Sequence, residues 1–438
     1  MMKSIRNIYL SAVVITVAGM LTGCASSELP DSLPDNYVVN MVIPEQQIQL
    51  TGEQQAFAVA NNQFAFNFFN RINAIDGTKS SFCSPISVSY LLGMLQSGAT
   101  GETRQQIQRV LGMATEEPTA INGYFAKLMD EMQTLDPQVT LNIANSIFIN
   151  KDKATTKQAF AADMERYYQA TIDNLDFSNP SSVNIINDWC NDKTKGMIPK
   201  IIDEIGKNAV MYLLNAIYFK ADWTEKFEEK YTRNETFRTI TGKSKEIPMM
   251  HQRVRARFGE CPDYTSIYLP YGKGAFTMTI VLPNEGKTID DILPRIGYDL
   301  LLPKFCGVGE TYQEGICDVD VKIPRFETAT EMEELPDILS EMGMPLAFNS
   351  DFAEFTGMVN EGTLYVDKMK QKAKIEVNEK GSKAAAVTIA EMGFATAVGP
   401  SQNTVYEKRD FHANRPFVYL IKERGSGIVL FIGKYTGE

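Results

Sequence analysis

The stretch that most constrains this fold runs from Glu379 to Met392 and combines a run of alanines with a β-branched run. The alanines would suit a helix, but Gly381 interrupts its start, and the Val-Thr-Ile run at 387–389 resists helix formation. A strand is therefore the better prediction. Alternate side chains of a strand share a face, and one face here is free of charge. That face would carry Ser382, Ala384, Ala386, Thr388, Ala390, Met392 and Phe394.

The only charges between Gly381 and Phe394 are Lys383 and Glu391, and both fall on the opposite face. Loop-forming sequence follows at Gly393 and at 399–403, before Phe411 restarts an apolar pattern. A strand-like segment that leads into an exposed loop is unusual, because unpaired strands associate with other chains. An ordinary alanine-rich edge strand would explain this stretch alone. Motifs elsewhere in the chain favour a different interpretation.

Several separate motifs occur along the chain in a fixed order. They are Ser84-Pro-Ile-Ser87, Asn145-Ser-Ile-Phe148, Leu214-Asn-Ala-Ile-Tyr-Phe-Lys-Ala-Asp-Trp223, the hinge-like residues 371–386, and Asn414-Arg-Pro-Phe-Val-Tyr-Leu-Ile421. Together they resemble the serpins, a family of mostly inhibitory proteins that trap serine and sometimes cysteine proteases. The resemblance covers almost everything after about residue 52. It implies one α+β domain over residues 52–438, with three β-sheets, about nine helices and an exposed reactive-centre loop.

The resemblance also implies a mechanism in which the target protease supplies the catalytic groups. The protease cleaves a bait bond in the loop and forms an acyl-enzyme. The freed strand then inserts into the large sheet before water can release the protease. About 14 residues from Ser382 to Ala395, at roughly 3.3 Å each, would extend about 45 Å. That length is enough to carry the attached protease far from its starting position.

Insertion requires a hinge and an anchor at the start of the loop. The residues that match the family's hinge are Glu379, Lys380, Gly381, Ser382, Ala384, Ala385 and Ala386. Glycine permits the bend. We expect Glu379 to pair with Arg325 near Trp223, in the region that serpins call the breach. An ordinary core indole is a compatible interpretation of Trp223.

The family's usual spacing from Glu379 places the bait bond at Ala395–Thr396. A small residue there suits elastase-like proteases, because their substrate pockets are small. The loop is longer than is typical of the family, since Pro416 follows well beyond the bond. The position of the bait bond in the loop is therefore not fixed by this spacing. Phe394, Ala397 and Val398 are alternative baits for elastase-like, chymotrypsin-like or subtilisin-like enzymes.

Asn215 lies inside the apolar run 210–219, which predicts a strand covered on both faces. A buried amide without partners would cost about 1–3 kcal/mol, so Asn215 needs a polar network. The resemblance places it in the shutter, a polar cluster beneath the large sheet, with Ser84 and Ser87. The family has a histidine in this cluster where this chain has Gln371. Glutamine donates and accepts hydrogen bonds but takes no charge near neutral pH.

The N-terminus has the pattern of an export signal. Lys3 and Arg6 precede an apolar run from Ile8 to Leu21, which is short for a membrane span. The ending Leu-Thr-Gly-Cys24 resembles a bacterial lipobox and implies cleavage after residue 23 and lipidation of Cys24. A plain signal peptide is the simpler alternative. Residues 24–51 lack periodicity, so we expect them to form a flexible tether. The tether would hold the protein at the cell envelope, either facing the periplasm or exposed on the extracellular cell surface.

The composition argues against some classes of partner and of chemistry. A net charge of −11 and the lack of a basic stripe argue against nucleic acid. The chain has two histidines, His251 and His412, and neither lies in a nucleophile–base pattern. Without a cofactor or metal motif, we expect a monomer that is neither an enzyme nor a metalloprotein. We predict that Cys83 and Cys190 are buried thiols. The sequence alone does not decide whether Cys306 and Cys317 form a disulfide.

Periodicity and turn residues also predict individual elements. The predicted helices are 53–75, 85–95, 100–111, 160–168 and 183–194, and the predicted strands are 139–149, 210–219, 237–240, 264–271, 276–282, 319–323 and 364–368. The leading functional hypothesis is a lipid-anchored protease inhibitor. The alternative is a non-inhibitory serpin that acts as a binding or chaperone-like module. A hydrolase, the third hypothesis, has no supporting constellation.

Overall fold

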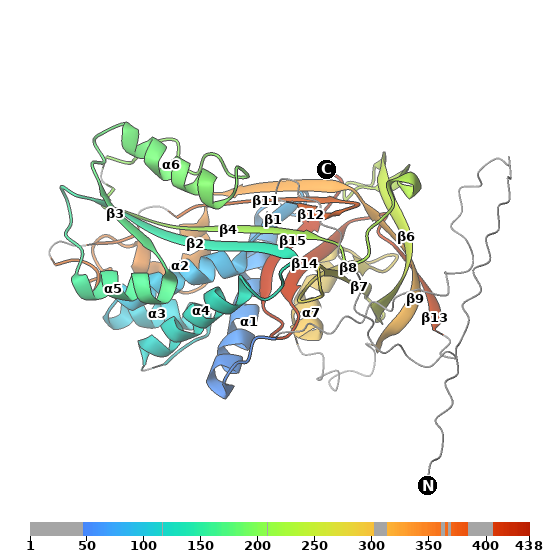
Figure 1. The fold of residues 1–438 in the computed structure, drawn as a ribbon, viewed down its shortest axis with the longest axis horizontal. Helices are drawn as coiled ribbons and strands as arrows, with labels where there is room; N and C mark the ends of the chain where they lie inside the picture. The colour runs from blue at the N-terminus through green and yellow to red at the C-terminus, as the bar shows by residue number, and fades with distance from the viewer. Residues whose placement is uncertain are drawn as a thin grey trace, which may run out of the picture.

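The computed structural model describes residues 47–115, 117–207, 209–301, 313–360, 364–366, 369–383 and 406–438. Figure 1 shows the main α-helices gathered under one face of a long sheet, while α6 lies on the other face. Strands β6, β9 and β13 of a second sheet lie at the end of the molecule that is farthest from α5 and β3 (Figure 1). None of the helices in these ranges combines the length and apolarity that a membrane span needs. Helices dominate the first half of the chain and strands the second, which confirms the predicted α+β class.

The described residues form eight α-helices and two short 3-10 helices. They are α1 (Gly52–Ile75), α2 (Pro85–Gly98), α3 (Gly101–Leu111), α4 (Pro118–Met132), α5 (Gln158–Tyr168), α6 (Ser181–Lys193), α7 (Ile289–Leu301), α8 (Leu335–Glu341), η1 (Glu229–Tyr231) and η2 (Pro345–Phe348). All five predicted helices are confirmed. Ser84 caps α2 as expected, because its hydroxyl accepts a hydrogen bond from the Ser87 N–H and Pro85 follows it.

Fifteen strands form two sheets among the described residues. They are β1 (Ser81–Cys83), β2 (Val139–Asn150), β3 (Thr171–Leu175), β4 (Met211–Asp222), β5 (Arg233–Arg238), β6 (Ser244–Glu260), β7 (Tyr264–Tyr271), β8 (Phe276–Pro283), β9 (Gln313–Pro324), β10 (Phe326–Met332), β11 (Gln371–Asn378), β12 (Gly381–Lys383), β13 (Glu407–His412), β14 (Phe417–Glu423) and β15 (Val429–Tyr435). The smaller sheet has the order β10-β11-β12-β4-β2-β3. The larger has the order β1-β15-β14-β8-β7-β6-β9-β13, and β5 also pairs with β6. Two of the three expected sheets are thus joined, because β6 is long enough to take part in both.

Helix α2 occupies the centre of the molecule, between the two sheets and the other helices. Every residue of α2 except Ser97 is buried, which is typical of a helix that is apolar on all sides. It contacts β4 of the smaller sheet and β15 of the larger one. Because α2 is fixed by both sheets, its first turn is a rigid platform for the polar residues Ser84 and Ser87.

Some expectations fail locally. Helix α4 was not predicted, although Ile121, Tyr124, Phe125 and Leu128 recur at helical spacing after Pro118. The predicted strand 364–368 is wrong in its described part, because residues 364–366 form no regular structure. The packed body already includes Ile48, which is buried ahead of the expected boundary at residue 52.

The described cysteines are buried free thiols, including Cys83 and Cys190 as predicted. Burial raises the pKa of Cys190 to about 12, so its thiol stays protonated. Cys317 is also a free thiol, so the structure contains no Cys306–Cys317 disulfide. Cys306 itself lies outside the described residues.

Candidate functional site

Strand β12 places the hinge residues Gly381 and Ser382 inside the smaller sheet. It pairs antiparallel with β11, where Ser382 lies opposite Val377, and antiparallel with β4, where Ser382 lies opposite Ala221. The Ser382 side chain is buried, and its hydroxyl lies 2.5 Å from the Tyr271 hydroxyl. This confirms that Ser382 belongs to an inward face, as its place in the alternating pattern predicts.

Gly381 is needed here because the backbones approach closely. A Cβ atom on Gly381 would lie 2.1 Å from the Ala221 carbonyl oxygen and 2.6 Å from the Asp222 Cα atom. No side chain fits at such distances. Gly381 was predicted to permit bending at the hinge, which stays a prediction; the structure adds a second role, which is to let β12 pack against β4.

Glu379, the first hinge residue, anchors the hinge through its buried carboxylate. The Arg325 guanidinium Nη2 donates to Glu379 Oε1 at 2.5 Å, and the Thr232 hydroxyl donates to the same oxygen at 2.6 Å. The Glu379 side chain is 4% exposed, whereas that of Arg325 is 46% exposed. Burial favours the neutral acid, but the hydrogen bonds from Arg325 and Thr232 outweigh it and lower the pKa of Glu379. The predicted Glu379–Arg325 pair is therefore present.

Trp223 fixes the turn that connects β11 to β12. Its indole Nε1–H donates to the Asn378 carbonyl at 2.9 Å, and its backbone N–H donates to the Lys380 carbonyl at 2.8 Å. The ring is buried and stacks on Tyr271, with centroids 4.5 Å apart and planes 10° apart. Trp223 is thus both a core indole and a direct hydrogen-bond partner of the hinge.

Beyond β12, the smaller sheet has a slot where a central strand is missing. Among the described strands, no ladder joins β11 directly to β4, so residues 371–375 of β11 and 211–220 of β4 face each other unpaired. The slot has a volume of about 880 Å³, including the part open to solvent. Side chains from α2, α6, β4 and β11 line it, and Ser382 lies at its upper end. An unpaired pair of parallel edges is a template for one more strand.

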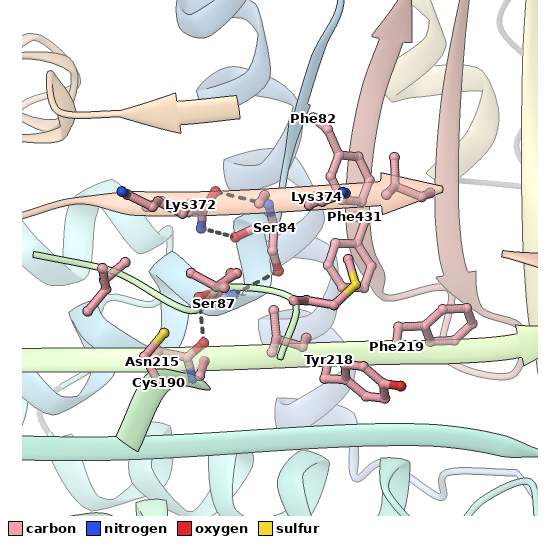
Figure 2. A pocket seen from close by; sticks show the side chains of 18 of the residues that line it. Phe82, Ser84, Ser87, Cys190, Asn215, Tyr218, Phe219, Lys372, Lys374 and Phe431 are labelled. Carbon is pink, nitrogen blue, oxygen red and sulfur yellow. Dashed lines mark hydrogen bonds between the residues drawn. The ribbon is translucent and has the colours of Figure 1, made fainter. Parts of the chain in front are cut away.

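A polar network crosses the floor of this slot (Figure 2). Figure 2 shows Ser84 and Ser87 at the start of α2, reaching toward β11 and β4. The Gln371 amide accepts from the Ser84 N–H at 3.0 Å and donates to the Ser84 carbonyl at 2.9 Å. The Ser87 hydroxyl donates to Asn215 Oδ1 at 2.5 Å, and Asn215 Nδ2 donates to Asn145 Oδ1 at 2.7 Å. The half-buried amide of Asn215 therefore has a partner on each side, as the predicted shutter requires.

A ladder of ion pairs joins β10 to β11 on one side of the slot. It consists of Lys370–Glu333, Lys372–Glu331 (2.8 Å) and Lys374–Glu327 (2.8 Å). Seven registered residue pairs run along the same two strands. On the other side of the slot, eleven registered pairs join β4 to β2. Each border of the slot is thus a firmly paired block.

Comparison with known proteins identifies this arrangement. A family model described as Serpin (serine protease inhibitor) matches residues 59–437. The chain belongs to the serpin family. The chain is 32% identical to human Serpin B3 over 399 residues, which cover 86% of this chain and 98% of that protein. It is 30% identical to the leukocyte elastase inhibitor of Xenopus tropicalis over 391 residues, with the same coverage.

A solved serpin structure shares the fold. The native-state crystal structure of the thermophilic serpin tengpin is similar with a TM-score of 0.75 and 27% identity, covering 91% of this chain and 99% of that one. In this serpin, the structure brings the described hinge residues together with Arg325 and Trp223 at one end of the slot, and the shutter residues at its middle. The two groups belong to one continuous feature of the sheet.

Three residues of this serpin site were missed by the sequence analysis. Tyr271 contacts both Ser382 and Trp223, Thr232 donates to Glu379, and Asn145 joins the shutter. Asn145 lies directly opposite Asn215 on the neighbouring strand. Two asparagines in otherwise apolar strands were the signal available for that pair. Tyr271 and Thr232 left no signal, because their roles depend on the packing of one sheet against the other.

The remaining predicted site residues lie outside the described residues. They are the lipidation site Cys24, the hinge residues Ala384, Ala385 and Ala386, the bait bond Ala395–Thr396, and the alternatives Phe394, Ala397 and Val398. For these positions the assignments stay predictions.

Proposed function

We propose that this serpin inhibits serine endopeptidases, and in some cases cysteine endopeptidases, by inserting its cleaved loop into the slot between β11 and β4. The observation that supports the proposal most is β12 itself. Its residues already pair with both strands at one end of the slot, and no described strand pairs with the edges of β11 and β4 beyond them. A cut loop needs only to continue a strand that has begun.

The attack follows the ordinary serine protease reaction. The protease serine Oγ forms a bond to the carbonyl carbon of Ala395, and the amide bond to Thr396 breaks. The new amine of Thr396 leaves with a proton from the protease histidine. The residues from 384 to 395 then remain covalently attached to the protease while they insert, and the acyl bond is dragged away from its starting point.

The register of β12 defines what each inserted residue would meet. Six residues beyond Ser382, Thr388 would lie opposite Asn215 on β4 and Gln371 on β11. Its side chain would share the inward face of Ser382 and reach the shutter. A threonine hydroxyl both donates and accepts, so it suits this polar floor where an apolar residue would leave the amides without new partners. Ala384 and Ala386 would pass over the apolar part of the slot.

Incubation with pancreatic or neutrophil elastase tests the function. We expect an SDS-resistant complex whose mass is the sum of the protease and the N-terminal part of the inhibitor. Cleavage without a complex would instead indicate the non-inhibitory alternative, a binding or chaperone-like module. Hydrolysis of a peptide substrate by the protein alone would contradict the proposal that it is not an enzyme.

A matched pair of variants tests the inserting face. Ala384→Arg places a charge on the face that must become buried, and we expect the variant to be cleaved as a substrate with at least tenfold less complex. Ala385→Arg places the same side chain on the opposite, outward face and should trap protease nearly as well as the parent. Equal behaviour of the two variants would show that the assigned face is wrong.

The proposed bait residue Ala395 favours elastase-like targets, with chymotrypsin-like and subtilisin-like enzymes as alternatives at Phe394, Ala397 and Val398. The name of the Xenopus relative, leukocyte elastase inhibitor, is in line with this choice. Mass spectrometry of the denatured cleavage products identifies the bond, because the C-terminal fragment carries strands of the larger sheet and would stay with the folded body. A peptide that begins at Thr396 would support Ala395 as the bait.

We also propose that the protein is a monomer held in the bacterial cell envelope by a lipid on Cys24, so that it meets proteases outside the cytoplasm. Acidic composition and the tether-like residues before the packed body support a protein that stands off a membrane surface. Labelling with a fatty acid should mark the parent and not Cys24→Ser. Label retained in Cys24→Ser would contradict the lipid anchor.

A further inference from the structure

The only two histidines of the chain meet around one aspartate on the larger sheet. His251 lies on β6, Asp320 on β9 and His412 on β13. His251 Nε2 lies 2.5 Å from Asp320 Oδ1, and His412 Nε2 lies 3.7 Å from Asp320 Oδ2. These three residues are far apart in sequence and none of them belongs to the slot.

A second carboxylate lies in the same cluster. Asp410 of β13 is registered directly beside Asp320 of β9. Ligand atoms of Asp320, Asp410 and His412 all lie within 4.8 Å of one another. Two like charges side by side on neighbouring strands destabilise a sheet unless a cation lies between them.

The nearby cationic side chains are committed to other carboxylates. Arg253, registered beside Asp320, binds Asp318 through two hydrogen bonds of 3.0 and 3.1 Å. Lys322, between the two histidines in the register, binds Glu235 at 3.0 and 3.1 Å. Among the residues that the structure describes, His412 Nε2 is buried without a hydrogen-bond partner. The cluster therefore has two acidic oxygens and an imidazole nitrogen facing one small volume.

We propose that Asp320, Asp410 and His412 bind a divalent transition-metal ion of the zinc class. One imidazole nitrogen and two carboxylate oxygens are ordinary zinc ligands, and three protein ligands leave a fourth position for water. His251 has a positioning role, because its hydrogen bond holds the Asp320 carboxylate in the orientation that directs the other oxygen toward His412. Asp410 is exposed and Asp320 is half-buried, so the ion can enter from solvent.

The proposed ion would join an edge strand to the interior of the sheet. In the described part of the chain, β13 pairs only with β9 and ends the order of the larger sheet. It is also the first described strand after the reactive loop. Ligands from β13 and β9 would hold this strand in place while the loop is cut and pulled from its other end.

Metal binding is measured by titrating zinc into the chelator-treated, tag-free protein in a calorimeter. We expect one ion per chain and a rise in Tm on zinc addition. Asp410→Asn and His412→Gln should each lower the affinity at least tenfold, and His251→Gln by about tenfold. Asp188→Asn, an exposed aspartate on α6, is the matched control and should bind zinc as the parent does.

Two further readouts separate a metal site from a merely structural cluster. Without metal, Asp410→Asn should melt higher than the parent because it removes the carboxylate repulsion, yet zinc should no longer raise its Tm. Cobalt should bind without the sulfur-to-metal absorption band that a cysteine ligand would add. Substoichiometric zinc, binding unchanged in both Asp410→Asn and His412→Gln, or a cobalt–thiolate band would each overturn the proposal.

Discussion

The two sheets of this molecule differ in how completely they are paired. In the larger sheet, β14 pairs along its length with β8 and β15, and every residue of β14 and β8 is buried. In the smaller sheet, β4 has a complete partner in β2 but only two paired residues in β12, and its first five residues are only partly buried. The central strands of the larger sheet are paired on both edges, whereas in the described part of the smaller sheet β11 and β4 each have an edge that is largely without a strand partner. Under the proposed function, insertion of the cleaved loop between β11 and β4 would pair these edges and give a better-bonded arrangement of the same chain.

The largest expected effect is a rise in Tm when the loop is cut. Insertion of residues 384–392 would create roughly ten backbone hydrogen bonds at about 1 kcal/mol each. A gain of about 10 kcal/mol corresponds to a Tm rise on the order of 20 °C in a protein of this size. Calorimetry of intact and loop-nicked protein measures it. A nicked form that melts no higher than the intact form would contradict the proposal that the smaller sheet takes up the cut loop as an additional strand.

The next largest effects are expected from two glycine substitutions, one in each sheet, which should affect stability and complex formation differently. In Gly433→Ala, the new Cβ would lie 2.6 Å from the Tyr419 ring and 2.7 Å from the Ser81 carbonyl, within the larger sheet. We expect a loss of about 2–4 kcal/mol in both intact and nicked protein. Gly381→Ala would force β12 away from β4 and should also reduce complex formation with elastase. Unchanged trapping by Gly381→Ala would contradict the role of β12 as the start of insertion.

The Glu379 anchor should make the smaller sheet sensitive to acid. Because the folded-state pKa of Glu379 is lowered, its contribution is present above the unfolded-state pKa, about 4.3, and is lost as pH falls through the folded-state value. Arg325→Met leaves the carboxylate without its main partner and should cost about 1–3 kcal/mol at pH 7. Glu379→Gln should weaken the acid dependence. Denaturant unfolding between pH 3 and pH 7 measures both, with Gly433→Ala as a variant whose acid dependence should match the parent.

The shutter should show a smaller effect. Ser87→Ala removes the donor to Asn215 Oδ1, and we expect a loss of about 1–2 kcal/mol in the intact protein. Ser89→Ala on the same helix is the matched control, because the buried Ser89 hydroxyl has no hydrogen-bond partner among the described residues. Its removal should be neutral or slightly stabilising. Equal losses in both variants would mean that the network adds nothing beyond packing.

The smallest effect is spectroscopic. The two tryptophans report on different ends of the slot, since Trp223 packs on Tyr271 beside the hinge and Trp189 lines the open part. In Trp223→Phe, which keeps the ring stack and costs about 1 kcal/mol for the lost indole donor, Trp189 is the sole emitter. Its fluorescence should change when the loop is cut. Constant emission would place the inserted strand elsewhere.

The sequence predicted the parts of the site that depend on local chemistry. The Ser84 cap, the polar Asn215 within an apolar strand and the uncharged alternation around Ser382 each follow from rules that act over a few residues. The family resemblance supplied the Glu379–Arg325 pair, which no local pattern could predict. Tyr271, Thr232 and the His251–Asp320–His412 cluster were missed because their contacts arise from strand register between distant segments, and a sequence without partners to compare gives no register. The close approach of Gly381 to β4 was not predicted, because it depends on the pairing of β12 with a distant strand.

The ion-pair ladder between β10 and β11 has a consequence for how the slot can widen. Cross-strand charges and a full register lock those two strands into one slab, as the β2–β4 register does on the far side. Opening either slab would break several cross-strand hydrogen bonds, and in the β10–β11 slab also the ion pairs. If the loop inserts as proposed, the two slabs would have to move apart as units. The contacts that resist this are β12, which pairs with both β11 and β4, and the first turn of α2, where Ser84 binds Gln371 and Ser87 binds Asn215.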